Sequence, residues 1–333
     1  MKIAKEQQYE SFVFRGEQPE PLRFPSMIPG SLQIRSSTFL EDPGSVLYAE
    51  GQDYLVDTAS CTVRRTPNSR IPDWSGHPLC GIKRFDHAAY PDVSNCRYTV
   101  YASYRYADEE EKAPSADAAR SVGCLRRIAG GRQDGNPVKL LIFGDSISTG
   151  CEASRPELAY FGLVAAELHR LNSSLSLQIV NKAICGETSR DGLARFERDV
   201  LPEDADIVVF GYGMNDHSWM SETLPNGVPP AEYTRNLASM IERLLERGHP
   251  QIVLVTPCEA NPLWLHYSPD MPAYVQALYG LADTYGLAIA DANRIWREEL
   301  RAGKSPESLL RNNINHPNDY GHFLYYQAFL PLL

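Results

Sequence analysis

The chain has 333 residues, of which 43% are hydrophobic and 22% are charged, and its formal net charge is −10. This is the balance of a globular protein, and the length exceeds that of one ordinary domain, so we expect two domains. An acidic chain without a block of lysines and arginines argues against a nucleic-acid partner. No apolar run of about 18 residues occurs, so no membrane span is expected.

The cysteines favour a reducing compartment. There are seven, an odd number, and they are widely spaced without a Cys-x-x-Cys pair. Such usage is more typical of reduced thiols than of disulfides or zinc ligands. The N-terminus has no apolar run that would make a signal peptide, so the expected location is the cytoplasm.

The first third of the chain predicts a small β-sandwich of the jelly-roll type. Short extended runs alternate with turn residues, and helical periodicity is weak. In the last run, from Tyr98 to Tyr106, every second side chain is apolar or aromatic, which is a strand signature. We interpret the charged stretch 107–112 as a bridge between domains 1–112 and 113–333, with a helix over 115–128 in the second. The earlier strands are expected at 45–49, 54–57 and 61–64.

The second half predicts a parallel sheet. Continuous apolar runs alternate with amphipathic segments, as in sheets that helices cover on both faces. The chemistry of such sheets lies outside the carboxyl ends of the strands, so the residues directly after each strand are the ones to inspect. Strands are expected at 138–143, 177–180, 207–210, 251–255 and 287–290, and helices at 160–170, 231–247 and 272–285.

Ser146 follows the first of these strands, in the sequence Gly144-Asp145-Ser146. Gly144 permits a tight turn, and a serine close to a helix start lies among unpaired backbone N–H groups. Those groups suit a nucleophile whose reaction develops an oxyanion. In isolation, however, a helix-capping serine is the commoner interpretation.

Two other residues follow predicted strands in the same way, and a third precedes a predicted helix. Gly186, after the second strand, can present its N–H to a ligand without a side chain in the way. Asn215, after the third strand, offers an amide donor. His316 precedes Pro317, which suits the first position of a helix and leaves the histidine on a loop. Taken singly, these are also what a loop glycine, a turn residue and a packed histidine look like.

Together and in this order, these positions resemble the four sequence marks of the SGNH hydrolases, also called the GDSL family. The resemblance extends from about residue 138 to 333 and implies a three-layer α/β/α, flavodoxin-like domain. It also implies that Ser146 is the nucleophile, that His316 transfers the proton, and that no metal or organic cofactor is needed. The implied oxyanion hole consists of the N–H groups of Ser146 and Gly186 and the amide of Asn215. The marks are Gly144-Asp145-Ser146, Gly186, Gly213-Met214-Asn215-Asp216 and His316-Pro317-Asn318.

One position departs from the family pattern. The family usually has an aspartate three residues before the histidine, and this chain has Asn313 there, next to Asn312. An asparagine oxygen can orient the imidazole without a charge, or a backbone carbonyl can do so in a Ser-His dyad. A carboxylate elsewhere, such as Glu259 or Asp216, is a third alternative. We favour the first two and leave them open.

A β-domain ahead of such a domain resembles two-domain bacterial carbohydrate acetylesterases, some of which use a Ser-His dyad. This favours a small-molecule or oligosaccharide ester as substrate, with acetyl as the acyl group. Trp219 and Trp264 are candidate sugar-binding residues, although packing is the commoner role of tryptophan. The alternatives are a lipase, thioesterase or arylesterase at the same site, or a weakly catalytic carbohydrate-binding protein. Homo-oligomer formation is left open.

A metal site is not expected. Asp86-His87 together with His77 offers metal-binding side chains, but their loose spacing is more typical of turn or surface residues.

Overall fold

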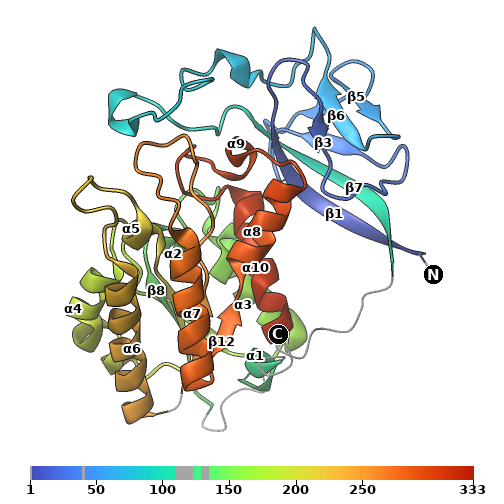
Figure 1. The fold of residues 1–333 in the computed structure, drawn as a ribbon. Helices are drawn as coiled ribbons and strands as arrows, with labels where there is room; N and C mark the ends of the chain where they lie inside the picture. Colours follow the sequence, from blue (N-terminus) through green and yellow to red (C-terminus); the bar gives the residue numbers. More distant parts are fainter. Residues whose placement is uncertain (1, 40–41, 110–122, 129–134, 249) are drawn as a thin grey trace.

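The computed structural model describes residues 2–39, 42–109, 123–128, 135–248 and 250–333. The second half of the chain forms a parallel five-stranded sheet with helices on both faces, which confirms the expected α/β/α fold (Figure 1). The strand order is β12-β11-β10-β8-β9, so β8 lies between β10 and β9. The strands are β8 (Val138–Gly144), β9 (Leu177–Asn181), β10 (Ile207–Gly211), β11 (Gln251–Val255) and β12 (Ala288–Ala290).

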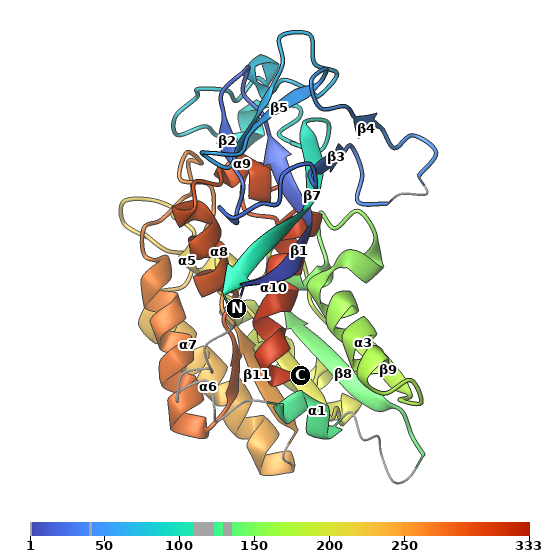
Figure 2. The ribbon, with the colours of Figure 1, turned by 90° about the vertical axis from the view of Figure 1, so that its right-hand side faces the viewer.

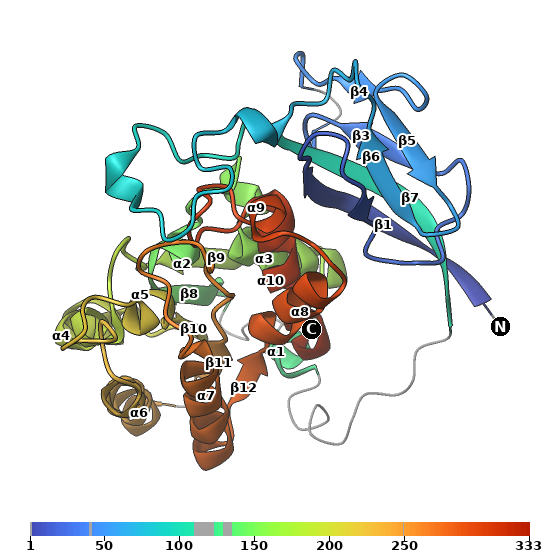
Figure 3. The same cartoon turned by 45° about the horizontal axis from the view of Figure 1, so that its top comes forward.

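Two helical layers enclose the sheet (Figure 3). In one layer α6 contacts both α4 and α7, and in the other α10 contacts both α3 and α8. From residue 138 onward, the predicted strands and the helices predicted at 160–170, 231–247 and 272–285 agree with the structure to within one residue. The helix expected to start at Pro317 starts at Asp319, and α4, α5, α8 and α9 were not predicted. The helices are α1 (Cys124–Ile128), α2 (Ser146–Thr149), α3 (Tyr160–Leu171), α4 (Ser189–Asp199), α5 (Met214–His217), α6 (Pro230–Arg247), α7 (Met271–Tyr285), α8 (Ala292–Arg301), α9 (Pro306–Leu309) and α10 (Asp319–Phe329).

The apolar pattern of the sequence explains the layers. The central strands β8, β10 and β11 are buried almost throughout, as strands covered on both faces must be. β9, at the edge of the sheet, is largely exposed. Helix α6 buries one stripe of side chains at helical spacing, including Tyr233, Leu237 and Met240, and leaves the opposite face polar.

The first part of the chain forms two antiparallel sheets, which confirms the expected β-sandwich. One has the order β1-β7-β3-β4 and the other β2-β6-β5. In β7 the side chains of Val100, Ala102, Tyr104 and Tyr106 are all buried, as the period-two pattern predicted. The strands are β1 (Lys2–Val13), β2 (Glu20–Pro21), β3 (Gln33–Arg35), β4 (Leu47–Tyr48), β5 (Tyr54–Asp57), β6 (Thr62–Arg65) and β7 (Thr99–Glu109).

The long strand β1 was not predicted, because its sequence is rich in charged and polar residues. It pairs with β7 over nearly its whole length and lies beside α9 and α10 of the second half (Figure 2). Glu10 is fully buried and forms an ion pair with Lys304, whose side chain is also buried. Nearby, Glu299 pairs with Arg23, and burial raises the pKa of Glu299 to about 7. The polar residue Glu10 of β1 is therefore buried through a contact with a residue far away in the sequence.

The two halves share part of their core. A separate cluster of apolar side chains, including Phe12 and Tyr104, fills the β-sandwich. However, Trp74, Leu79 and Phe85 from the first half pack into the large core of the second half. The boundary predicted near residue 112, and most of the helix predicted over 115–128, lie outside the described residues, so the division at 112 stays a prediction.

None of the helices in the described ranges is both long enough and apolar enough to cross a membrane.

The carboxyl ends of β8 and β10 approach each other very closely. A Cβ atom added to Gly144 would lie 2.3 Å from the carbonyl oxygen of Gly211, which is backbone and cannot move aside. A Cβ atom added to Gly211 would lie 2.1 Å from the hydroxyl oxygen of Ser148. Gly144 therefore needs glycine for lack of space, whereas a side chain at Gly211 would require the hydroxyl of Ser148 to rotate away.

We expect the substitution Gly144→Ala to lower the free energy of unfolding by about 3 kcal/mol, as overpacking in a tight core does. The matched control is Gly280→Ala in the exposed middle of α7, where an added Cβ meets nothing within 4 Å. Alanine should raise the stability there by about 0.5–1 kcal/mol, because it favours helix over glycine. Urea denaturation measures both changes, and equal effects at the two positions would contradict the packing constraint.

Candidate active site

Ser146 begins the one-turn helix α2, directly after the central strand β8. The side chain of Asp145 caps this helix by accepting the backbone N–H of Ile147 at 3.0 Å. The hydroxyl oxygen of Ser146 lies 2.8 Å from Nε2 of His316. The structure thus brings together a serine and a histidine 170 residues apart, at the distance that proton transfer from a nucleophile requires.

His316 lies on the loop between α9 and α10, as expected, although α10 begins at Asp319 with Asn318 as its cap rather than at Pro317. The side-chain oxygen of Asn312 organises this loop. It accepts the backbone N–H groups of Ile314, Asn315 and His316 at 2.9–3.0 Å. The loop is therefore fixed by its own asparagine, and this fixes the histidine that follows.

The imidazole of His316 has an unusual environment. Burial, with a smaller contribution from nearby His322, lowers the pKa of His316 to about 4. Within the described ranges no residue forms a hydrogen bond with Nδ1 of His316. The ring is therefore neutral at neutral pH, and its Nε2 is free to accept the serine proton.

The three alternatives that the sequence left open for orienting His316 can be compared with this geometry. The side-chain oxygen of Asn313 accepts hydrogen bonds from Asn95 and Asn261, both at 3.2 Å. Asp216 accepts the backbone N–H and the hydroxyl of Ser189, and Glu259 accepts from the amide of Asn293. None of these groups is bonded to His316, so the role of Asn313 as its orienter stays a prediction.

Asn95 is a residue of the first half that the sequence analysis did not single out. It is fully buried, and its side-chain amide donates to the carbonyl oxygens of Glu307 at 3.2 Å and Leu310 at 3.0 Å and to the side chain of Asn313. Its own side-chain oxygen accepts the indole N–H of Trp74 at 2.7 Å. The first half of the chain thus holds the segment that leads into His316. An isolated asparagine in a turn-rich stretch gives no sequence signal of this.

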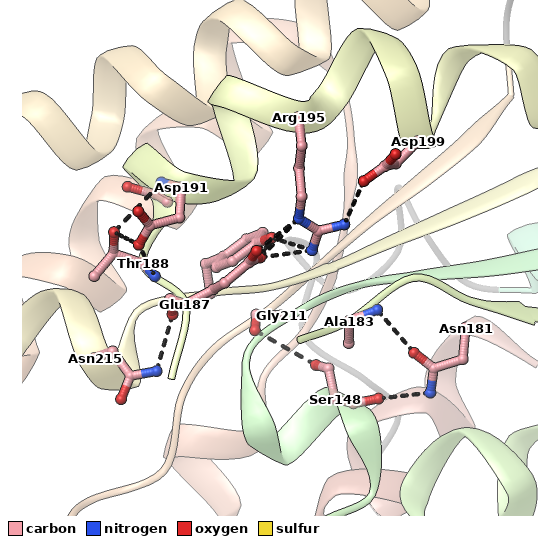
Figure 4. A network of polar contacts seen from close by, with 12 residues as sticks. Ser148, Asn181, Ala183, Glu187, Thr188, Asp191, Arg195, Asp199, Gly211 and Asn215 are labelled. Atoms are coloured by element: carbon pink, nitrogen blue, oxygen red, sulfur yellow. Dashed lines mark hydrogen bonds and ion pairs between the residues drawn. The ribbon is translucent and has the colours of Figure 1, made fainter. Parts of the chain in front are cut away.

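The other two expected donors flank Ser146 on the neighbouring strands. Gly186 follows β9 and has a φ of 82°, a backbone conformation that favours glycine. Asn215 lies in α5, after β10, and its amide donates to the carbonyl oxygen of Glu187 at 2.9 Å (Figure 4). Since β8 lies between β9 and β10, Ser146 stands between the loops of Gly186 and Asn215.

The loop of Gly186 is anchored by a nearly buried ion pair. The carboxylate of Glu187 accepts two guanidinium N–H groups of Arg195, at 2.7 Å and 2.6 Å, and also the hydroxyl of Tyr212 (Figure 4). Thr188 and Asp191 form a capping box at the start of α4. A bidentate, shielded pair of this kind fixes geometry well, so the loop that carries Gly186 has a defined position on its α4 side.

Each of the two candidate sugar-binding tryptophans contacts a histidine. Trp264 is only 8% exposed, and its indole N–H donates to Nδ1 of His87 at 3.1 Å. Trp219 is partly buried, and its carbonyl oxygen lies 2.9 Å from Nδ1 of His266. Trp264 therefore offers little free surface for stacking, and Trp219 offers more.

One group of side chains in the described ranges could offer metal ligands. Asp86, His87 and His266 have ligand atoms within 4.8 Å of one another, whereas His77 lies elsewhere, stacked on Trp74. Nδ1 of His87 accepts the indole N–H of Trp264. In a neutral imidazole the hydrogen must then be on Nε2, so neither nitrogen has a free lone pair for a metal. The hydrogen bonding thus opposes a metal at His87.

Comparisons with known proteins agree with this arrangement. A model of the GDSL-like lipase/acylhydrolase family matches residues 142–324, a range that includes Ser146, Gly186, Asn215 and His316. An acetylxylan esterase of Geobacillus stearothermophilus is 31% identical over 216 residues, which cover 59% of this chain and 94% of that protein. The esterase TesA of Pseudomonas aeruginosa is 34% identical over 118 residues, covering 34% of this chain and 52% of its own length.

Among solved structures, that of the acetylxylan esterase Axe2 from Geobacillus stearothermophilus is similar to this chain. It is 30% identical, with a TM-score of 0.49 over 60% of this chain and 95% of that chain. The family match covers more than half of the present chain and includes all four residues of the candidate site. The chain therefore belongs to the GDSL-like lipase/acylhydrolase family, and it is a carboxylic ester hydrolase.

Proposed function

We propose that this protein removes acetyl groups from carbohydrate esters through an acyl-enzyme on Ser146. The observation that carries the proposal is the 2.8 Å contact between the hydroxyl of Ser146 and Nε2 of His316 at the carboxyl edge of the sheet. The acetyl and carbohydrate parts are supported by the acetylxylan esterase relative, nearly all of which aligns with this chain.

In the proposed mechanism Ser146 loses its proton to Nε2 of His316 as its oxygen attacks the acyl carbon. The negative charge that develops on the carbonyl oxygen is stabilised by the N–H groups of Ser146 and Gly186 and by the amide of Asn215. That amide donates one hydrogen to Glu187 and has a second one for the oxyanion. His316 then returns the proton to the leaving alcohol, and water releases the acyl group by the same steps in reverse.

We further propose that Ser146 and His316 work as a dyad. The absence of a hydrogen bond to Nδ1 of His316 within the described ranges supports this, as does the pKa of His316, which burial lowers to about 4. Among the described residues, no carboxylate is a resolved influence on the pKa of His316, so an imidazolium formed there has no charged partner from this part of the chain. Because a weaker base has a smaller driving force for proton transfer, the Ser-His pair depends more heavily on the oxyanion donors.

A second candidate is an esterase for aryl or longer acyl esters. An arylesterase of Vibrio mimicus is 32% identical over 114 residues, which cover half of that protein, and TesA matches over a similar share. The same serine and histidine would serve this reaction, so the distinction lies in the acyl group that fits.

The substitution Ser146→Ala should reduce ester hydrolysis by about 10³-fold or more and abolish covalent labelling by a fluorophosphonate. The matched control is Ser148→Ala on the same helix turn, whose hydroxyl contacts that of Tyr160 at 3.0 Å rather than a base. That variant should still be labelled by the fluorophosphonate.

The acyl group is tested with a panel of esters. Acetate release from acetylated xylo-oligosaccharides should exceed hydrolysis of octanoyl esters, and the opposite preference would overturn the acetyl assignment.

The substitution Asn313→Asp tests what orients His316. Since the side-chain oxygen of Asn313 is held by Asn95 and Asn261, a carboxylate there should not reach the imidazole. We expect kcat/KM to rise by less than about threefold, if it rises at all. We expect the melting temperature to fall, because the substitution buries a charge. A gain of tenfold or more would instead place residue 313 in a catalytic triad.

The pH dependence tests the dyad independently. His316 must be neutral to accept the serine proton, and its pKa is lowered to about 4. The acid limb of kcat/KM should therefore have its midpoint near pH 4, with activity kept at pH 5 to 6, where an ordinary histidine would be charged. Intrinsic fluorescence recorded at each pH shows whether the fold is intact. A midpoint at or above 6.5 would indicate a carboxylate partner for the imidazole.

A further inference from the structure

Two cysteines face each other beside the proposed site. The sulfur atoms of Cys151 and Cys185 lie 3.2 Å apart, although the residues are 34 positions apart in the chain. The hydroxyl of Thr149 lies 3.2 Å from the first sulfur and 3.4 Å from the second. Both cysteines are free thiols in this structure. The remaining five cysteines have no such contact between sulfur atoms in the described ranges.

The two cysteines lie on the two segments that carry Ser146 and Gly186. Cys151 follows α2, and its backbone N–H donates to the carbonyl oxygen of Ser146 at 3.1 Å. Cys185 directly precedes Gly186, the expected oxyanion donor. A covalent link between the two sulfurs would therefore tie the loop of the nucleophile to the loop of the oxyanion hole.

We propose that Cys151 and Cys185 are a redox modification site at which a hydroperoxide forms a reversible disulfide that lowers esterase activity. Cys185 is exposed and Cys151 is partly buried, so the oxidant reaches Cys185 first. The thiolate of Cys185 attacks the peroxide oxygen, giving a sulfenic acid and releasing the alcohol or water. The sulfur of Cys151 then displaces the hydroxyl group, which leaves as water, and the disulfide forms.

The disulfide should act mainly on the loop of Gly186. A sulfur–sulfur bond needs the two atoms about 1 Å closer than they are now. Residues 184–186 are exposed, and a Cβ atom at Gly186 would meet nothing within 4 Å, so Cys185 and Gly186 have room to move between two anchored neighbours. Those neighbours are Ile184, whose N–H donates to Gly144, and Glu187, which pairs with Arg195. Cys151 is held by the backbone of Ser146 and is surrounded more closely. The bond therefore draws Gly186 out of position, and a shift of about 1 Å in a catalytic group can cost about 100-fold in rate.

Burial raises the pKa of Cys151 to about 11, with Thr149 and Cys185 as further influences. Its thiol is therefore mostly protonated at neutral pH, which protects it from direct oxidation and makes it the resolving partner. Ring closure should accordingly be faster at higher pH.

The effect on activity rests on the proposed function of Gly186, whereas formation of the bond does not. The test exposes the purified full-length protein to hydrogen peroxide at a small molar excess, followed by peptide mass mapping under non-reducing conditions. We expect one cross-linked species joining the peptides of Cys151 and Cys185, lighter than the reduced pair by two hydrogen atoms. Activity should fall by roughly 10-fold to 100-fold and return with dithiothreitol.

Three variants serve as controls. Cys151→Ser and Cys185→Ser should keep the activity of the reduced protein and lose reversible inactivation by peroxide. Cys96→Ser removes an exposed thiol that contacts Arg311 instead of another cysteine, and it should respond like the unmodified protein. A missing cross-link, or a cross-link that leaves activity unchanged, overturns this inference. If reduced protein hydrolyses no ester while the cross-link still forms, the proposed function fails separately.

Discussion

The close approach of strands β8 and β10 at their carboxyl ends is the constraint on which the site depends. Gly144 and Gly211 lie opposite each other in the sheet, and Gly144 has no room for a Cβ atom because the backbone of Gly211 lies against it. The backbone N–H of Asp145 bonds to the carbonyl oxygen of Gly211 at 3.1 Å, directly where α2 starts. This contact turns the chain sharply and presents Ser146 at the edge of the sheet. A larger residue at Gly144 would press on the backbone of Gly211 directly beside this turn.

The remaining parts of the site are set by neighbouring elements rather than by Ser146 itself. The parallel order of β9, β8 and β10 brings the loops of Gly186 and Asn215 to either side of the serine. Buried polar contacts then fix each loop: Glu187 with Arg195 on one side, and Asp216 with Ser189 on the other. Buried charged groups are costly when unpaired, so these pairs favour one arrangement of the loops over others.

The first part of the chain contacts and supports the loop that carries His316. Asn95 holds the segment before His316, and β1 lies beside α9 through contacts such as the backbone N–H of Val13 with the hydroxyl of Ser308 at 2.9 Å. The acetylxylan esterase relative aligns with only 59% of this chain. The family match begins at residue 142, so Asn95 and β1 support the histidine loop from outside the matched range.

Local sequence pattern was sufficient to predict the parallel sheet of the second half and its longest helices. Its five strands are continuous apolar runs and its longer helices α3, α6 and α7 were read from the local pattern to within one residue, whereas α4 and α8 were not. The sequence also singles out Ser146, Gly186, Asn215 and His316, because together and in order they resemble the marks of one family. The structure brings Ser146 and His316 into contact, and the oxyanion roles of Gly186 and Asn215 stay predictions. The tertiary structure decided what lies around them. It buried the polar strand β1, joined Asn95 to Asn313, and placed Cys151 beside Cys185. These contacts join residues distant in sequence, and isolated polar residues have no periodicity from which their partners could be inferred.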